Sequence, residues 1–481
     1  MLFPTVAFAV FFVAAFTVNW VLRPNYPLWR ATMIAFSLYF CGWVDLRFAL
    51  VAIGSAALNT VLAAAAHRAM RRGDPTVESR RFVRIAVVAD LAVLGVFAYH
   101  GFLVESVSDA LHSIGLSPTD PVLDMLVPVG LSVFTLHAIS YVVDVGRGDI
   151  EPVAFGDLLL YLTFFPHLVV GPVVRVDELV PQFHERPDPR RVAATDAFVL
   201  IGVGLVKAVV VAGYLGTELV DPAFATPGSV GGLALLVGAY ALAIQIYAGL
   251  SGATDVAVGC ALLLGVDYPQ NFDAPYQSLS VREFWERWNM TLSRWLRDYL
   301  YIPLGGSRHG LPATCRNLMI TMMLGGLWYG VGWTFVVWGG LHGAYLVVQR
   351  AASSWYDEWR GADTDTPPGR VGTVLRWAST FSLVSLAWVF FRADSVGDAL
   401  EILGRIATGA SGSTDLVTGL VALTIVAALA SQLVSDHRTL GLRARFSPLR
   451  PVAQVAVLAA GLTIIGVLGP RGTAPVGHLP F

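Results

Sequence analysis

Long apolar runs separated by short polar segments dominate the hydropathy pattern of this chain. The first run, residues 1–22, contains no charged residue and is long enough to cross a bilayer, which takes about 20 residues. No basic segment precedes it, so we expect a retained transmembrane helix and not a cleaved signal peptide. Further candidate spans cover residues 31–44, 48–66, 85–104, 125–145, 153–172, 193–217, 230–250, 252–266, 313–329, 331–349, 372–391, 416–435 and 451–469. The pattern predicts roughly 10–13 membrane-crossing helices.

One stretch, Ser280–Arg308, lies between apolar runs but is rich in Trp, Arg and acidic residues. Read as one helix, it places apolar and aromatic residues at three- and four-residue steps on one broad face. These residues are Phe284, Trp285, Trp288, Leu292, Trp295 and Leu296, and the polar Asn289 shares their face. Pro303, Gly305 and Gly306 then end the helix. An aromatic face with a charged back is typical of a membrane–water boundary. The stretch is either an anchoring helix or a partly inserted element that holds a reaction site at membrane depth.

Composition supports a membrane protein. Of the 481 residues, 55% are hydrophobic and 14% charged, whereas soluble domains carry about 25% charged residues. We predict a single all-α membrane domain over residues 1–481, a polytopic helical bundle. The net charge of −2 gives no reason to expect a nucleic-acid partner. Cys41, Cys260 and Cys315 fit neither a disulfide framework nor a metal site. Lys207 is the only lysine, which we interpret as a coding bias towards arginine.

Arginine-rich loops predict the orientation of the chain. Residues 67–84 contain six arginines, and residues 436–450 contain four. Both segments are therefore expected on the cytoplasmic side.

Polar and helix-breaking residues interrupt several apolar runs. Pro166 and the pair Gly171-Pro172 must break a helix within or beside the membrane. Irregular backbone is tolerated there only inside protein or beside a water-filled cavity, so this segment is expected on the wall of a central cavity. Asp144 and Arg147 are expected to pair at a helix end. His137 and Asp255 lie in apolar runs, where an ionisable group needs a partner.

Several blocks resemble the signature of the membrane-bound O-acyltransferase family, in the branch of bacterial alginate O-acetylases and teichoic-acid D-alanyl transferases. The first block, F-W-E-R-W-N-M-T-L-S-R-W-L-R-D-Y-L-Y-I-P-L-G-G, covers Phe284–Gly306. A second lies within residues 244–276 and matches at Gln245, Tyr247, Ser251, Gly252, Thr254, Asp255 and Gly259. A third covers residues 317–343. Similar sequence also surrounds His137, His167 and Trp388–Ala393, so the resemblance extends over roughly residues 1–400.

The chain departs from the family pattern where the family carries ionisable groups. Asn289 stands where that branch has His, Tyr329 stands in W-Y-G where the family has W-H-G, and Gly249 replaces an Asp. His342 in W-G-G-L-H-G is kept. A neutral His is the usual base for acyl transfer to a hydroxyl. Asn cannot serve as a base at neutral pH, and Tyr has an ordinary pKa near ~10.

The resemblance implies a multi-pass protein of the bacterial plasma membrane, with re-entrant or interfacial helices around a central tunnel. It implies an acyl-CoA or acyl carrier protein thioester as donor, no further cofactor and no metal. The implied partners are membrane lipids and an extracytoplasmic glycan acceptor or a partner acyltransferase. Catalytic candidates are Tyr329, Asn289 and His342. Candidate substrate-binding residues are Trp285, Trp288, Arg297, Asp298, Trp328, Asp255, His137 and His167.

Two functional interpretations stay open at this stage. The chain is either an acyltransferase with rearranged catalytic groups or a catalytically silent relative that binds an acyl donor or lipid, or supports a cell-envelope complex. A channel or secondary transporter is disfavoured, because no inverted repeat is visible.

Overall fold

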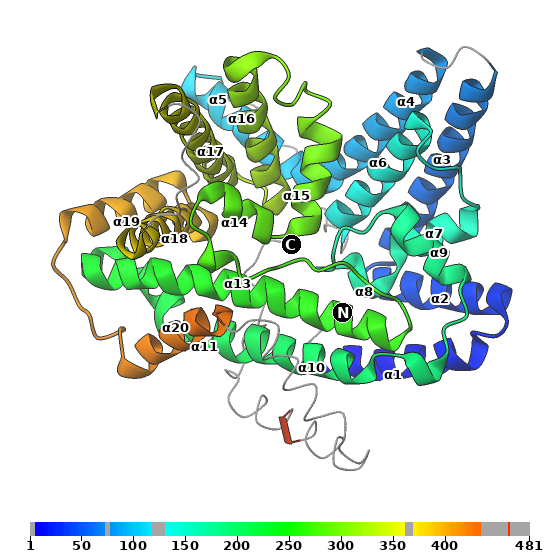
Figure 1. Cartoon of the computed structure of the whole chain (residues 1–481), viewed down its shortest axis with the longest axis horizontal. Helices are drawn as coiled ribbons and strands as arrows, with labels where there is room; N and C mark the ends of the chain where they lie inside the picture. The colour runs from blue at the N-terminus through cyan, green and yellow to red at the C-terminus, as the bar shows by residue number, and fades with distance from the viewer. Residues whose placement is uncertain (1–4, 73–76, 117–129, 361–368, 434–459, 462–481) are drawn as a thin grey trace. The chain divides into compact units, whose positions relative to one another are not determined.

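The computed structural model describes residues 5–72, 77–116, 130–360, 369–433 and 460–461 (Figure 1). Most of these residues are helical, and in this part of the chain the single β-bridge, Val230 with Ser413, belongs to no strand. The prediction of an all-α fold is confirmed.

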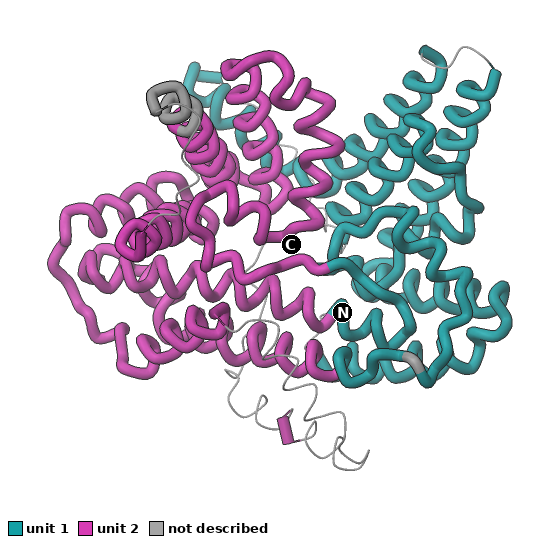
Figure 2. Tube along the Cα trace, viewed as in Figure 1, with its two compact units in different colours: residues 1–197, 257–269, 481 teal, residues 198–256, 270–480 magenta. Residues whose placement is uncertain are grey.

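The chain divides into two compact units, coloured teal and magenta in Figure 2. Unit 1 comprises residues 1–197, 257–269 and 481, and unit 2 comprises residues 198–256 and 270–480. The prediction of a single domain stays a prediction.

Unit 1 is built on helices that end or begin at polar capping residues. The side chains of Thr5, Asn25 and Asp45 accept backbone N–H bonds at the starts of α1, α2 and α3, which satisfies donors that a helix start leaves unpaired. Helices α3, α4 and α6 pack against one another. The helical segments are α1 Val6–Leu22, α2 Tyr26–Cys41, α3 Leu46–Arg71, α4 Val77–Leu94, η1 Gly95–Tyr99, α5 His100–Ser113, α6 Leu131–Arg147, α7 Phe155–Thr163, α8 Phe165–Leu168, α9 Val176–His184 and η2 Pro189–Arg191.

Unit 2 contains most of the remaining helices. Helix α10 begins in unit 1 and continues in unit 2, and the part of α13 from residue 257 onwards belongs to unit 1. The segments are α10 Ala194–Leu205, η3 Val206–Val211, α11 Ala212–Leu215, η4 Gly216–Val220, α12 Asp221–Ala225, η5 Pro227–Ser229, α13 Gly232–Leu263, η6 Pro275–Gln277, α14 Val281–Arg287, α15 Met290–Leu296, η7 Arg297–Tyr301, α16 Gly310–Tyr329, α17 Trp333–Arg360, α18 Arg370–Arg392, α19 Val396–Thr408 and α20 Gly419–Gln432.

Helices α16 and α17 cross very closely because glycines line their contact. A Cβ atom on Gly326 would lie 2.3 Å from the carbonyl oxygen of Phe335, and one on Gly339 would lie 2.3 Å from that of Met322. No side chain fits at such distances, so only glycine permits this approach. The crossing brings the end of α16, where Tyr329 lies, beside Trp338 of α17.

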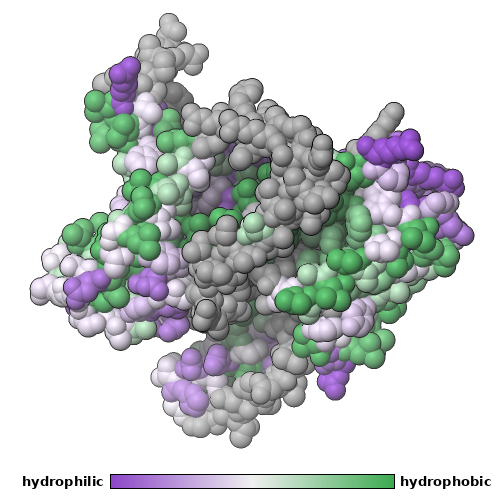
Figure 3. Space-filling model, turned by 90° about the horizontal axis from the view of Figure 1, so that it is seen from below, coloured by the Kyte–Doolittle hydropathy of each residue, from purple (hydrophilic) through white to green (hydrophobic). Residues whose placement is uncertain are grey.

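Five helical runs of the described residues are long and apolar enough to cross a membrane. They are Leu46–Arg71, Val77–Ser113, Ala194–Ala225, Gly232–Leu263 and Arg370–Arg392. Shorter apolar helices are α1 and α20. Large apolar side chains are exposed at helical spacing on α1 and α20, including Val6, Val10 and Val13, and apolar residues cover much of the described surface visible in Figure 3. Such faces suit contact with lipid. The total number of spans stays a prediction.

Two details of the predicted spans were wrong, and the first is that the runs 230–250 and 252–266 form the single helix α13. The run 85–104 lies within the longer helical stretch Val77–Ser113, which is a candidate membrane span. The run 153–172 is not one span but the two helices α7 and α8, divided at Phe164. The predicted break in this segment is therefore confirmed. Residues 436–450 and most of 451–469 lie outside the described residues.

Candidate functional site

The tryptophan-rich stretch is two helices and not one. Helix α14 ends at Arg287 and α15 begins at Met290, because Asn289 adopts a left-handed backbone conformation with φ 41° and ψ 57°. Asn adopts this conformation at lower cost than most residues. The end of α14 and the start of α15 are held by an extended segment: Asn271 O accepts from the Met290 N–H at 2.8 Å, and its side-chain oxygen accepts from the Thr291 hydroxyl at 2.8 Å. The predicted continuous helix is corrected on this point.

This break turns the two replaced family positions towards each other. The side-chain amide of Asn289 donates to the phenolic oxygen of Tyr329 at 2.9 Å, and the indole N–H of Trp288 donates to the same oxygen at 3.2 Å. Tyr329 is buried, with 1% of its surface exposed. Two nitrogens, from the end of α14 and the break, thus converge on one oxygen at the end of α16.

The ring of Trp338 contacts both Tyr329 and His342, so His342 lies one aromatic ring away from Tyr329. Its Nδ1 accepts from the indole N–H of Trp285 at 3.2 Å. A ring nitrogen that accepts carries no proton, so the neutral ring carries its proton on Nε2. Nε2 is buried and has no hydrogen-bond partner within the described residues. In this tautomer His342 offers a proton donor and not an unused basic lone pair, which argues against the role of general base.

Aromatic rings enclose the centre. The ring of Trp338 lies 5.4 Å from that of Tyr329 and 4.8 Å from that of His342, measured between centroids, and stacks on Trp388 at 4.9 Å. The indole nitrogens of Trp338 and Trp328 are buried without a partner in the described part of the chain. The result is a mostly apolar surrounding in which a few N–H groups are the available polar contacts.

Other predicted site residues of unit 2 lie outside this cluster or at its edge. Trp328 packs edge-on against Tyr329, with ring centroids 5.0 Å apart. Arg297 pairs with its neighbour Asp298 at 2.7 Å at the start of η7. Asp255 pairs with Lys207 of η3 at 2.8 Å. The expectation that Asp255 is hydrogen-bonded is therefore confirmed.

His137 and His167 belong to unit 1, where they contact each other. Their ring centroids are 4.7 Å apart and neither residue is exposed. Nε2 of His137 accepts the Val174 N–H at 3.1 Å, and Nδ1 of His167 lies 3.0 Å from the hydroxyl of Tyr268. These contacts fasten α6 to the irregular backbone after α8. The predicted pair of Asp144 with Arg147 is confirmed at 3.8 Å.

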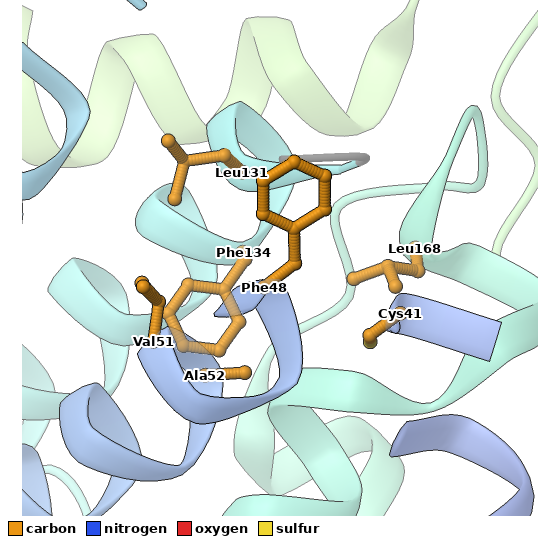
Figure 4. Close-up of a pocket in the computed structure, with 7 residues that line it drawn as sticks. All are labelled: Cys41, Phe48, Val51, Ala52, Leu131, Phe134 and Leu168. Carbon is orange, nitrogen blue, oxygen red and sulfur yellow. The ribbon is translucent and has the colours of Figure 1, made fainter. Parts of the chain in front are cut away.

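A small pocket in unit 1 is apolar and does not resemble a catalytic site. It is lined by Cys41, Phe48, Val51, Ala52, Leu131, Phe134 and Leu168 (Figure 4). Six of the seven are apolar, and the thiol of Cys41 is a weak hydrogen-bonding group. Convergent polar groups are therefore missing from its lining.

A polar cluster at the start of α2 was missed by the sequence reasoning. Asp157 accepts from the hydroxyl of Tyr26 and from Arg30, whose Nη1 lies 3.0 Å away, and Nε2 of His184 lies 3.4 Å from its other oxygen. Burial and the bond to Asp157 raise the pKa of Tyr26. Burial also lowers the pKa of Arg23, which donates to the carbonyl of Gln182, to about 10. The cluster connects α2, α7 and α9, so its role is structural.

Lys207 was also missed, since it was interpreted as a coding bias. The signal was available: a single lysine in an apolar run needs an acidic partner, and Asp255 lies in another apolar run.

The fold and the site together define a multi-pass helical membrane protein with a buried polar centre that joins a broken helix to the end of a neighbouring one. The model of the membrane-bound O-acyltransferase family matches residues 122–391, and this chain belongs to that family.

The chain is similar to named proteins from several bacteria. A protein from Pseudomonas putida named probable alginate O-acetylase is 39% identical over 335 residues, 69% of this chain and 66% of the relative. A peptidoglycan O-acetyltransferase from Helicobacter pylori is 31% identical, over 79% of this chain and 74% of the relative. A teichoic acid D-alanyltransferase from Streptococcus thermophilus is 28% identical, over 53% of this chain and 64% of the relative. The matched part of this chain spans about two thirds of the alginate relatives.

Proposed function

We propose that this protein transfers an acyl group from a cytosolic thioester, acyl-CoA or an acyl carrier protein, to a hydroxyl of an extracytoplasmic glycan or related polymer. The support is membership of the family and similarity to relatives named for O-acetylation of alginate and peptidoglycan and for D-alanylation of teichoic acid. A central tunnel that exposes Asn289 and Tyr329 to both substrates is part of this proposal. No cofactor beyond the thioester is required.

The observation that carries the proposal is the convergence of Asn289 and Trp288 on the oxygen of Tyr329. Both contacts donate to the phenolic oxygen, and the phenol carries one donor of its own, the O–H. Hydrogen bonds that a hydroxyl accepts strengthen the one that it donates. Tyr329 is therefore assigned the role of donor to the thioester carbonyl oxygen, where negative charge develops as the acceptor attacks.

The reaction can then be written without a protein base. The acceptor hydroxyl oxygen attacks the carbonyl carbon, and the C–O ester bond forms. The C–S bond breaks, and the departing thiolate takes the proton lost by the hydroxyl. Asn289 and Trp288 hold Tyr329 in place, while His342 can donate from Nε2. Losing a general base costs about 10²–10⁴-fold in rate, so turnover is expected to be slower than that of a histidine-bearing relative.

The alternative, a silent relative that binds an acyl donor, is favoured by the burial of Tyr329 among rings. Full burial disfavours a charged phenolate, and neither Asn289 nor His342, in the tautomer that the bond from Trp285 selects, replaces the base. Binding needs the tunnel and its N–H donors but no proton acceptor.

Thiol release by the purified full-length protein, with acetyl-CoA and a soluble glycan acceptor, tests the proposal. Tyr329→Phe should lower kcat about 10²–10³-fold, as expected for loss of a donor to a developing oxyanion. The matched control is Tyr240→Phe, which removes a phenol that pairs with Ser382 at 3.0 Å and should leave kcat unchanged.

Two results distinguish the interpretations. If wild-type protein releases no thiol above buffer with any acyl thioester tested, yet binds a non-cleavable thioether analogue, the silent-relative interpretation replaces the enzymatic one. If thiol release occurs and Tyr329→Phe does not change it, the protein is an enzyme but the role given to Tyr329 is wrong.

A further inference from the structure

Six arginines surround the connection between α3 and α4, all in unit 1. They are Arg68, Arg71 and Arg72 at the end of α3 and Arg80, Arg81 and Arg84 at the start of α4. All six are exposed. We refer to them as the arginine patch.

The two helices place the patch beside the membrane. Leu46–Arg71 and Val77–Ser113 are both candidate membrane spans, and α3 and α4 pack against each other. Apolar sequence ends at Ala66 on α3 and resumes at Ile85 on α4. The patch thus begins within one turn of the hydrocarbon-facing segments on both helices. Guanidinium groups in this position reach the layer of lipid headgroups.

The patch has a large excess of positive charge. Residues 67–84 contain six arginines and two acids, Asp74 and Glu78, for a net charge of 6 − 2 = +4, in a chain whose total is −2. Blocks of this kind near a membrane attract anionic lipids.

Most of this charge is unused by the protein itself. Arg71 pairs with Glu151 at 3.0 Å, and Nε of Arg68 donates to the carbonyl of Ala64 at 3.1 Å. Nearby on α6, Arg147 is matched by Asp144. The side chains of Arg72, Arg80, Arg81 and Arg84 have no ion-pair or hydrogen-bond partner within the described residues. Four guanidinium groups on two adjacent helix ends therefore remain for an external anion.

We propose that the arginine patch binds the headgroups of anionic phospholipids in the leaflet that faces the cytoplasm. The positions of the arginines favour lipid over a soluble acidic protein, because all of them lie within about two helical turns of hydrocarbon-facing sequence. Planar guanidinium groups also match phosphate oxygens in pairs. This inference does not depend on the acyl-transfer proposal.

The test measures the phospholipid retained by full-length protein. The protein is purified in detergent from mixtures of phosphatidylglycerol and phosphatidylcholine, and the bound lipid is determined by mass spectrometry. Wild-type protein should retain more phosphatidylglycerol than phosphatidylcholine, and rising salt should reduce this preference. Replacing Arg72, Arg80, Arg81 and Arg84 together by Gln should lower the preference at least tenfold, since each charge near the surface contributes about fivefold.

Two variants serve as controls. The same four positions changed to Lys keep the charge and should keep most of the preference, which separates electrostatics from a folding defect. Gln at four other exposed arginines, Arg282, Arg308, Arg370 and Arg376, should leave it unchanged.

Equal retention of both lipids by wild type, or full retention by the four-Gln variant, overturns the proposal. If phosphatidylglycerol is not preferred but an added acidic acyl carrier protein binds wild type and not the four-Gln variant, the patch is a protein-docking surface and the lipid proposal is wrong.

Discussion

The side-chain amide of Asn289 donates to the phenolic oxygen of Tyr329 at 2.9 Å, although 40 residues separate them in the chain. These are the two positions at which the resemblance to the family branch implies histidine. Their direct contact means that the two replacements form one polar pair. A pair that retains hydrogen bonding but lacks a base is consistent with a site that still binds a carbonyl group.

Restoring histidine at both positions should raise acyl transfer. In the variant Asn289→His with Tyr329→His, a neutral imidazole can accept the hydroxyl proton, so thiol release should increase by about 10²–10⁴-fold. The increase should fall as the pH drops below the pKa of imidazole, near 6.5, because the protonated ring is no longer a base. Thiol release measured from pH 5 to pH 8 checks both points. An unchanged rate in a variant that folds and binds the thioester would show that more than the base is missing.

The backbone at Asn289 should be as sensitive as its side chain. With φ at 41°, a β-branched residue there is strained by roughly 1–2 kcal/mol, so Asn289→Val should lower the unfolding temperature. Asn289→Gly relieves that strain but removes the bond to Tyr329. Glycine should therefore be more stable than valine, while both lose the amide's contribution to catalysis. Thermal unfolding of the three proteins in detergent measures the order, and equal stability of Gly and Val would contradict the role of the left-handed conformation.

Hydropathy predicts the helical class because burial in lipid requires long apolar helices, but it does not predict where helices break. The three- and four-residue spacing of aromatic residues continues through Trp288 and Asn289, so periodicity alone indicates one helix. The break depends on Asn271, which receives the first N–H groups of α15 from outside the stretch. The converse error occurred at Ser251, which lies between the predicted spans 230–250 and 252–266 but is inside α13. Gly252 inside α13 does not mark a break. It permits a close approach of Gly204, because a Cβ atom at position 252 would lie 2.5 Å from the Gly204 oxygen.

The ion pair of Lys207 and Asp255 should show strong coupling on mutation. Each charge sits in a candidate membrane span and the Nζ–Oδ2 distance is 2.8 Å. Removing one partner leaves an uncompensated charge, which in buried pairs costs about 3–5 kcal/mol of stability. Both side chains are partly exposed, so the expected cost is near the lower of these values. Lys207→Met and Asp255→Asn should each destabilise the protein.

The double variant distinguishes an ion pair from two independent polar groups. Lys207→Met combined with Asp255→Asn should be more stable than the sum of the single changes predicts, because no isolated charge remains. Thermal unfolding of the four proteins completes the cycle. Strictly additive losses would mean that the two groups do not depend on each other.

Asp90 should behave as a neutral acid in the span that contains α4. Its Oδ1 accepts from Ser55 Oγ and from Asn59 Nδ2, both at 2.9 Å. Its Oδ2 and the Oδ1 of Asn59 are buried acceptors without a partner in the described part of the chain. A proton on Oδ2 would let Asp90 donate to Asn59 Oδ1 and satisfy both oxygens, as an acid–amide pair does. An ionised carboxylate would leave both acceptors unpaired in an apolar surrounding.

Asp90→Asn supplies the same donor in the same shape, so the unfolding free energy should change by less than about 0.5 kcal/mol. Asn59→Leu removes both the donor and the acceptor facing Asp90 and should cost about 1–3 kcal/mol. Thr60→Val, at the next position along α3, is the matched control, because the Thr60 hydroxyl bonds only to the carbonyl of Ala56 in its own helix. If Asp90→Asn destabilises the protein as much as Asn59→Leu, the carboxyl group of Asp90 is charged and the prediction of a neutral acid is wrong. Whether Asp90→Asn loses less unfolding free energy than Asn59→Leu therefore decides between a neutral and a charged carboxyl group at the contact between α3 and α4.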